Sequence, residues 1–484
     1  MDDQSSPSSG IDAFRDLERW LSGQAAQSAG MSELERESER RGREILRLAL
    51  QAHIDARGDG DIGEAIVVAE ENESVRLAHK RVHTRPLVTL FGEVRVTRVG
   101  YGARGREAIH PLDAQLRLPG RLWSYECQRR LIRAVICGPF DEAITLIAEM
   151  TGTTIPKRSA EQLVQDAAVD FETFYAARAA GGVEPADGEI LVSAIDCKGI
   201  PMVKPEQALR VVRRGKGEKA NKKRMATVAA VHSQPPIPRT PKDVIDSLFA
   251  SEIQTERPKR PKPSHKRVWA SLTASKDAFI NDVKTEMTRR DPNHERTWVI
   301  VTDGERALQR RVIASFENVT LVLDLLHVLE KLWKVAHALH PEGSIEAEAF
   351  VRARTERILC GMTRQVVKGL RQTVTKRRLT GQKANTIHGV CDYLYRNRER
   401  MRYDEYLRNG WPIASGTVEG ACKNLIRDRF ERSGMRWTIP TAEALLKLRA
   451  AHLSGDLNDY WEHHITLDQQ RLYGQHARQP EPSS

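Results

Sequence analysis

The chain has 484 residues, of which 40% are hydrophobic and 29% are charged. This composition is typical of a folded, soluble protein and excludes an intrinsically disordered one. Lys and Arg total 76 against 65 Asp and Glu, a net charge of +11, and no 18-residue segment lacks a charged residue, which argues against a membrane-spanning helix. The N-terminus has neither the basic nor the apolar region of a signal peptide, so we expect a cytoplasmic protein. Six scattered cysteines without a Cys-x-x-Cys pair indicate neither a disulfide framework nor a zinc knuckle.

The positive charge is concentrated in one part of the chain. Residues 1–80 hold ten basic and 17 acidic side chains, whereas residues 351–410 hold 15 basic and five acidic ones. Shorter basic runs lie at 213–224 and 257–267. Because each neutralised phosphate releases a counterion, this distribution favours nucleic acid as the partner. For any single run, the alternative is a basic loop that contacts solvent and binds no partner.

In chain order, the first 80 residues are predicted to be helical. Residues 32–35 fit a capping box, and the apolar pattern that follows ends at Gly58. Residues 87–99 alternate between apolar and polar side chains around a central Gly-Glu, which predicts a β-hairpin with its turn at that pair.

Three helices are predicted next. They cover 124–136 and 141–150, and the third begins at a capping box over 159–162. The last two fit a helix-turn-helix that would bind DNA within 141–175, although their connection exceeds the usual three or four residues. An ordinary helical pair is the alternative.

The pattern then changes to strands that alternate with helices at 276–290 and 305–316. The predicted strands are short, apolar and β-branched, and they cover 190–195, 226–231, 298–302 and 319–323. Such strands imply a sheet that is buried on both faces, and therefore an α/β domain. The Pro- and Lys-rich stretch 235–267 is predicted to be a loop or flexible insertion. Residues 328–408 are predicted to be a basic helical insertion into this domain.

Two aspartates directly follow apolar runs. They are Asp196 and Asp303, and Gly304 would let a ligand or metal come close. The carboxyl ends of buried strands are where an α/β sheet exposes functional groups, and paired carboxylates suit Mg²⁺. Two such ions can stabilise the attacking and leaving oxygens of a phosphoryl transfer. A capping or turn role for each aspartate is the alternative.

A third carboxylate belongs to Glu419, which is predicted to lie in the first turn of a helix that Ser415 or Thr417 would cap. Lys423 and Arg427 follow at four and eight residues, on roughly the same helical face. That face would combine a metal-binding carboxylate with phosphate-binding cations. The alternative is a surface ion pair between Glu419 and Lys423 that complements the helix dipole.

Asp196, Asp303 and Glu419, with a helical insertion before the last, resemble the DDE triad of cut-and-paste transposases with an RNase H-like domain. The sequence Asp324-Leu-Leu-His327 is similar to the [Cys/Asp]-x-x-His signature of the Mutator-like and related superfamilies. The resemblance covers roughly residues 85–455. Three further segments resemble the Kra-type insertion-sequence transposases of bacteria, namely 416–423, 434–437 and 448–450.

This resemblance implies an RNase H-like mixed sheet with helices on both faces. An all-α insertion would interrupt the sheet domain, and a mainly helical N-terminal region with a β-hairpin would precede it. Asp196, Asp303 and Glu419 would bind two Mg²⁺ or Mn²⁺ ions, and the enzyme would cleave and join DNA strands at the ends of an insertion element. Its partners would be double-stranded DNA at terminal inverted repeats and target DNA. At least two copies would act together near the nucleoid, because two element ends must be joined.

Further site residues are expected from the same resemblance and from the charge pattern. Asp324 and His327 would line the active site or position DNA near it, with a structural histidine as the alternative. Arg436 and Trp437 would clamp or stack on a flipped base, and a buried Trp beside an exposed Arg is the alternative. The other expected DNA-binding residues are Lys376, Arg377, Arg378, Lys423 and Arg427.

The predicted organisation has six parts. They are an N-terminal region with a hairpin (1–110), a helical region (111–184), the first part of the catalytic domain (185–327), the insertion (328–410), the last part of the catalytic domain (411–455) and a tail (456–484). Two other functions stay open: a transposase-derived DNA-binding protein without catalysis, and an RNase H-like nuclease that cleaves without joining.

Overall fold

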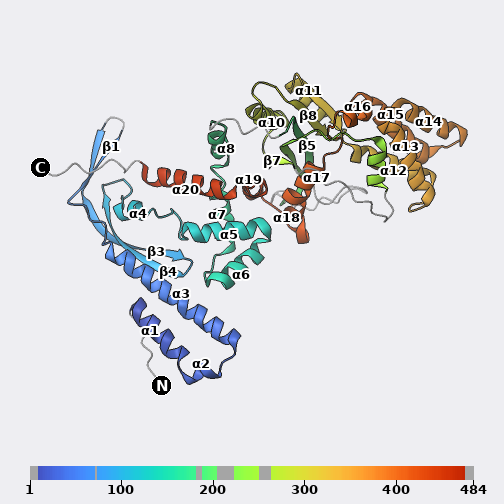
Figure 1. The fold of residues 1–484 in the computed structure, drawn as a ribbon. Coiled ribbons are helices and arrows are strands. Elements are labelled where there is room, and N and C mark those ends of the chain that lie inside the picture. The colour runs from blue at the N-terminus through green and yellow to red at the C-terminus, as the bar shows by residue number, and fades with distance from the viewer. Residues whose placement is uncertain (1–8, 71–72, 181–187, 204–222, 250–262, 475–484) are drawn as a thin grey trace, which may run out of the picture. The chain divides into compact units, whose positions relative to one another are not determined.

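The computed structural model describes residues 9–70, 73–180, 188–203, 223–249 and 263–474 (Figure 1). The chain divides into two compact units. The first contains residues 1–170 and 458–484, and the second contains residues 171–457. None of the described helices is long and apolar enough to cross a membrane.

The first unit begins with helices and continues with two hairpins. Its elements are α1 (Gly10–Leu21), α2 (Gln24–Ser28), α3 (Met31–Ala56), β1 (Ile66–Glu70), β2 (Glu73–Leu77), β3 (His79–Thr89) and β4 (Gly92–Gly102). The prediction that the first 80 residues are helical is therefore wrong beyond residue 56, because the β-branched run 66–68 pairs with 75–77 in a hairpin. The capping box at 32–35 is also wrong, since α3 starts after Gly30 and Ser32 already lies in its first turn.

The predicted hairpin at 87–99 is confirmed as β3 and β4. Its register pairs Thr89 with Gly92, so the turn lies two residues earlier than the expected Gly-Glu. Gly92 has φ of 126°, a conformation that favours glycine. The inner faces of both strands pack with the end of α3 in a core of Ile54, Leu87, Val94, Val96, Leu112 and Leu118.

Short helices complete the first unit. They are α4 (Pro111–Gln115), α5 (Tyr125–Cys137), α6 (Phe140–Thr151), α7 (Lys157–Asp166) and, from the end of the chain, α20 (Leu457–Tyr473). The structure confirms the helices predicted at 124–136 and 141–150. The capping box at 159–162 is wrong, because α7 begins at Lys157 after Pro156 and Ser159 lies inside the helix. Residues 457–473, expected to be part of a tail, are helical.

The second unit is built on a five-stranded mixed sheet. Its strands are β5 (Ile190–Pro201), β6 (Lys223–Gln234), β7 (Ser264–Ser271), β8 (Thr297–Thr302) and β9 (Thr320–Leu323), in the order β7-β6-β5-β8-β9. Strands β5, β6 and β7 are antiparallel, whereas β5, β8 and β9 are parallel. Successive residues 190–195 of β5 are all buried, so helices cover both faces of the sheet. The fold class expected from the sequence, an RNase H-like mixed sheet, is confirmed.

The prediction of a loop over 235–267 holds for residues 235–240 but is wrong at 241–248 and 264–267. α9 (Pro241–Leu248) begins at a capping box of Thr240 and Asp243, and β7 forms the edge of the sheet. An edge strand tolerates charged side chains, which concealed the strand among basic residues. Residues 250–262 lie outside the described part of the chain.

Helices pack around the sheet, and a separate group of helices forms the insertion. The first set contains α8 (Phe171–Ala180), α10 (Lys276–Arg290), α11 (Arg306–Ser315), α17 (Gly416–Ala421), a π-helical turn (Cys422–Arg427), α18 (Asp428–Phe430) and α19 (Ile439–Ser454). The insertion contains α12 (Leu325–Leu339), α13 (Ile345–Leu359), α14 (Thr363–Lys376), α15 (Gly381–Asn397) and α16 (Tyr403–Arg408). The helices predicted at 276–290 and 305–316 and the helical insertion are confirmed.

Candidate active site

Three aspartates occupy equivalent positions on three neighbouring strands. Ile195 of β5 pairs with Thr302 of β8, which in turn pairs with Leu323 of β9. Asp196, Asp303 and Asp324 are the next residues, and neighbouring strands lie about 5 Å apart. One detail of the prediction is wrong: Asp196 does not end its strand, because β5 continues alongside β6 as far as Pro201.

Asp196 is held by two neighbours. Its Oδ1 accepts a hydrogen bond from the backbone N–H of Cys197 (2.7 Å), and the Cys422 Sγ lies 3.3 Å from its Oδ2. Burial, together with the charge of Asp196, raises the pKa of the Cys422 thiol well above its usual range. The thiol therefore stays protonated and donates to the carboxylate.

Asp303 lies beside a second carboxylate of like charge, that of Asp196. Its Oδ1 accepts the backbone N–H of Glu305 (2.9 Å), and its carbonyl accepts Gln309 Nε2 (3.1 Å). Burial raises the pKa of Asp303, and the charge of Asp196 raises it further. Two adjacent carboxylates that repel each other are stabilised by a bound cation.

The helical insertion packs against the end of β8. A Cβ added at Gly304 would collide with the ring of Tyr393, which belongs to α15. Burial raises the pKa of Tyr393, as does the charge of Asp303. The space beside Gly304, which we expected to admit a ligand, is therefore filled by this ring.

Asp324 is buried, and its side chain connects two segments of the chain. It caps α12 by accepting the N–H of Leu326 (2.8 Å). It also accepts the hydroxyl and the backbone N–H of Ser415, the latter at 3.3 Å. Ser415 therefore donates its hydroxyl to Asp324, and this bond joins the end of β9 to the segment that enters α17. Asp324 is therefore a buried link between these segments and does not lie at an exposed site.

His327 lies one turn into α12, about one third exposed, with its Nδ1 3.6 Å from Glu330 Oε2. His327 is one of the groups that lower the pKa of Asp303. The two side chains are therefore close enough to interact, and His327 lies near the candidate site.

The backbone of Glu419 lies in α17, which packs against β5 and β6. Its side chain lies outside what the structure describes. Cys422 follows three residues later and contacts Asp196, so α17 enters the neighbourhood of the two aspartates. Beyond Ala421 the expected regular helix is replaced by the π-helical turn, in which Lys423 and Arg427 are both exposed. Such turns occur mostly as single insertions within α-helices.

Trp437 is buried, as the simpler of the two sequence interpretations stated. Its indole N–H donates to Phe430 O (3.2 Å), and the Arg429 guanidinium lies 4.8 Å from its ring. Its backbone pairs with Pro201 and Val203. Arg436 beside it is exposed. The Trp437 backbone therefore holds the end of β5, while its buried ring contacts Phe430 and Arg429 and is not presented to a base in this conformation.

The candidate site is suited to a divalent cation. Among the side chains that the structure describes, no group of three His, Cys, Asp or Glu could hold a metal ion, and Glu419 is not among them. Asp196 and Asp303 nevertheless offer adjacent carboxylate oxygens whose charges repel, which is the ligand type that Mg²⁺ prefers.

A second feature is a basic groove between α14 and α15. It has a volume of about 500 Å³ and is lined by Arg364, Lys368, Arg371, Lys376 and Tyr395. Lys376, Arg377 and Arg378 are all exposed at the end of α14. Arg364, Lys368 and Arg371 lie at i, i+4 and i+7 on one helical face, a periodicity that could have predicted them. Tyr395, from the neighbouring helix, could not have been found this way.

Sequence reasoning also missed Cys422, Tyr393 and the Ser415 bond. Cys422 could have been found, because a residue three positions after Glu419 shares its helical face. Tyr393 and Ser415 reach the site from distant segments, and nothing local in the sequence signals this.

Comparisons with known proteins give little guidance. No protein-family model and no curated protein matches the chain. Among solved structures, the Drosophila P element transposase strand transfer complex is similar, with a TM-score of 0.25 and 12% identity, over 71% of this chain and 83% of that chain. A similarity this low carries no argument about the fold or the function of this protein.

Proposed function

We propose that the protein is a DNA transposase that cleaves and joins DNA strands with the help of divalent metal ions. The observation that supports this most is the in-register placement of Asp196 and Asp303 on neighbouring strands, with α17 packed on β5. Paired carboxylates at the point where the parallel pairing of β5 and β8 ends, inside an RNase H-like sheet, suit two-metal phosphoryl transfer.

In this proposal Asp196, Asp303 and Glu419 hold two Mg²⁺ or Mn²⁺ ions. When bound, such ions activate the attacking oxygen and stabilise the leaving oxygen. The chain itself orients the ligands: the Cys422 thiol and the Cys197 N–H fix the Asp196 carboxylate, and the Glu305 N–H fixes that of Asp303. Hydrogen bonds of this kind orient metal ligands in many proteins.

The DNA would lie along the basic surface of the insertion. The groove between α14 and α15, with Lys376, Arg377 and Arg378 at its end, supplies cations for phosphates. Tyr395 is 47% exposed there and offers a face for stacking. Lys423, Arg427 and Arg436 would contact DNA near the carboxylates. In α7, whose first residues are exposed and basic, Arg158 would contact an inverted repeat.

The DNA partners would be the terminal inverted repeats of a bacterial insertion sequence and a target duplex. At least two copies of the chain would hold the two element ends.

The decisive experiment uses Asp303→Asn in the full chain. We expect Mg²⁺-dependent cleavage and joining to fall by at least about 10³-fold, because the reaction loses a carboxylate that holds the ions. DNA affinity, measured in EDTA, should change less than about threefold. Glu317→Gln, which removes an exposed carboxylate of the same unit, is the matched control and should keep full activity.

Three results would contradict the proposal in different ways. Full activity of Asp303→Asn would refute the role of this carboxylate. Cleavage of DNA by the wild type without joining would favour the RNase H-like nuclease. DNA binding with neither reaction in Mg²⁺ or Mn²⁺ would favour the transposase-derived binding protein.

A further inference from the structure

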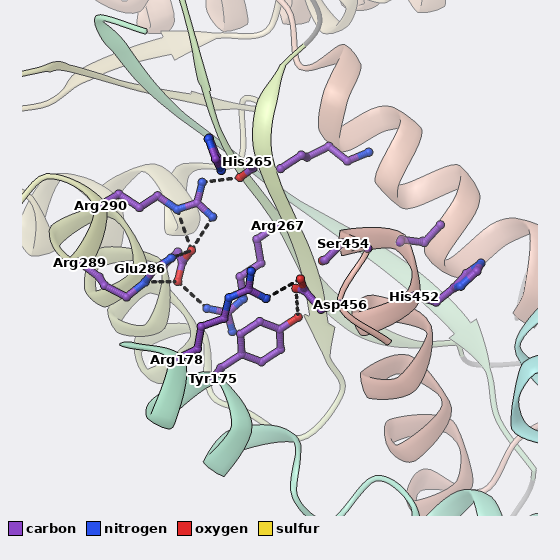
Figure 2. Close-up of a pocket in the computed structure, with 13 residues that line it drawn as sticks. Tyr175, Arg178, His265, Arg267, Glu286, Arg289, Arg290, His452, Ser454 and Asp456 are labelled. Carbon is purple, nitrogen blue, oxygen red and sulfur yellow. Dashed lines mark hydrogen bonds and ion pairs between the residues drawn. The ribbon is translucent and has the colours of Figure 1, made fainter. Parts of the chain in front are cut away.

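Cations near the sheet of the second unit differ in whether a carboxylate neutralises them. A pocket of about 430 Å³ beside β7 and α10 contains cations that are neutralised (Figure 2). Each of the four arginines that line it contacts either Glu286 or Asp456. A guanidinium that is already bonded to a carboxylate has to give up that bond before it can bind another anion. These arginines therefore hold the fold together.

Lys198 lies on the same face of β5 as Asp196. Side chains alternate along a strand, so residues two positions apart point the same way, about 7 Å from each other. The pairing of β5 with β8 ends at Ile195, so Lys198 extends past the end of that neighbouring strand. Burial raises the pKa of the Cys422 thiol, and the charge of Lys198 opposes this rise. Because Cys422 contacts the Asp196 carboxylate, the Lys198 ammonium lies beside the candidate active site.

Lys331 approaches the same site from the helical insertion. It lies one turn after His327, on the same face of α12. Its ammonium lies 5.1 Å from the centroid of the Tyr393 ring, and that ring packs against Gly304, directly after Asp303. Burial lowers the pKa of Lys331, and Asp303 is among the groups that raise it. The Lys331 ammonium is therefore close enough to the Asp303 carboxylate to interact with it.

Neither of these two lysines forms an ion pair with a carboxylate whose side chain the structure describes. Glu330, next to Lys331 in the sequence, contacts His327 instead (3.6 Å). Lys276 differs from both lysines, because it reaches the neighbourhood of Cys197 but binds Glu305 Oε1 through its Nζ (2.8 Å). The two unpaired lysines are partly exposed, so each can donate to an added anion. A partly buried ammonium without a partner is stabilised by such an anion.

We propose that Lys198 and Lys331 bind phosphates of one DNA strand on opposite sides of the bond that is cleaved. β8, which precedes Asp303, lies between β5 with Lys198 and β9, which leads into α12 with Lys331. The two lysines therefore flank the carboxylate pair. β5 and β9 are two strand spacings apart, about 10 Å, which is the rise of about three nucleotides of a DNA strand.

In this arrangement the reacting strand crosses the edge of the sheet from α12 to β5. A lysine ammonium suits this task, because it binds phosphate as a compact point charge and needs no fixed orientation. The inference rests on the DNA-binding part of the proposed function, and it adds the path of the strand across the candidate active site.

The first experiment measures protection of these lysines in the wild-type chain. Duplex DNA is added in EDTA, so that no metal-dependent cleavage occurs, and the acetylation rate of each lysine is followed by mass spectrometry. With DNA at about ten times its Kd, about nine in ten copies are occupied, so acetylation of Lys198 and Lys331 should slow about tenfold. Lys284, exposed on α10, is the control and should react at the same rate with and without DNA.

The second experiment measures duplex affinity in EDTA against salt concentration. The slope of log K against log salt should fall by about one in Lys198→Gln and in Lys331→Gln, because each variant loses one phosphate contact. Lys284→Gln is the matched control and should keep the wild-type slope. If DNA leaves the acetylation of both lysines unchanged, or if both variants keep the wild-type slope, the inference is wrong.

These outcomes are separate from those that test the proposed function. DNA that protects both lysines of a chain that neither cleaves nor joins strands would support the inference and contradict the transposase. Cleavage and joining by a chain whose two lysines stay unprotected would contradict the inference alone. A chain that binds no duplex would contradict both.

Discussion

Asp303 and Asp324 follow neighbouring strands at the same level of the sheet, but their surroundings give them different roles. Asp324 is 2% exposed, and its oxygens are engaged by Leu326 and Ser415. Asp303 accepts one backbone N–H and lies beside the charge of Asp196. A carboxylate with satisfied hydrogen bonds holds the fold together, whereas one opposed by a like charge is suited to bind a cation.

The Ser415 bond leads to a prediction about positioning. Ser415→Ala removes a hydroxyl that ties the start of α17 to Asp324, and we expect strand cleavage to slow about tenfold or more. DNA affinity should stay unchanged. Ser344→Ala, which removes a hydroxyl cap at the start of α13, is the control and should keep the wild-type rate. Equal rates for both variants would exclude a positioning role for Ser415.

His232 makes stability depend on pH. It lies on β6, 2% exposed, and burial lowers its pKa to about 4 from a usual value near 6.5. As pH falls below 6.5 the unfolded chain takes up the proton first, so the free energy of unfolding decreases until pH 4 and is level outside this window. We expect a loss of about 2 kcal/mol between pH 7.5 and pH 5 from this group.

Urea unfolding at these two pH values tests the role of His232. His232→Gln should reduce the pH dependence by that amount, because the amide does not titrate. An unchanged difference between the two pH values in the variant would mean that His232 is not the responsible group.

At the level of elements, the insertion is both a surface for ligands and part of the packing around the sheet. Tyr393 of α15 packs on Gly304 at the end of β8, and Tyr403 OH donates to Leu323 O (2.7 Å) at the end of β9. The insertion therefore contacts the ends of both strands that precede Asp303 and Asp324. Its basic outer face is free of this packing.

Charge reversal at Lys376, Arg377 and Arg378 should weaken DNA binding and flatten its salt dependence. We expect the slope of log K against log salt to fall by about two to three, because each cation that neutralises a phosphate contributes about 0.9. Filter binding at several salt concentrations measures it. Reversal of the exposed Lys242 and Lys284 is the control. A slope equal to that of the wild type would show that the three cations are only solvated.

The elements that sequence patterns missed share a physical cause. β7 and the β1–β2 hairpin are short or lie at an edge, and charged residues interrupt them, because an edge or a two-stranded ribbon leaves side chains in water. The strand β8 and the buried first half of β5 show continuous apolar runs, which predict them correctly because burial on both faces requires such runs.

At the level of the whole molecule, the first unit is assembled from the two ends of the chain. Tyr460 and Trp461 of α20 are buried, and the Tyr460 hydroxyl donates to Ala167 O. Asp170 is 4% exposed and contacts His464 Nδ1 (2.7 Å) and Arg471 Nη1 (2.6 Å) of the same helix. The helix therefore supplies both apolar packing and the partners of a buried charge.

Deletion of residues 458–484 should destabilise only the first unit. We expect a loss of about 5 kcal/mol or more, because apolar burial is removed and the buried Asp170 loses its contacts with His464 and Arg471. Scanning calorimetry should show the unfolding transition of the first unit at a lower temperature. The transition of the second unit should be unchanged and serves as an internal control. Two unchanged transitions would contradict this account.

The sequence by itself determined the α/β class, the apolar runs that precede Asp196 and Asp303, and the basic helical insertion, because these depend on local periodicity and composition. The tertiary structure decided the rest. Strand register aligns Asp196 with Asp303, and packing buries Asp324 and Trp437 while leaving Arg436 exposed. The Glu286 carboxylate joins Arg267 of β7 to Arg289 and Arg290 of α10. Register and long-range contacts depend on which faces meet in the folded chain, so patterns within short windows do not encode them.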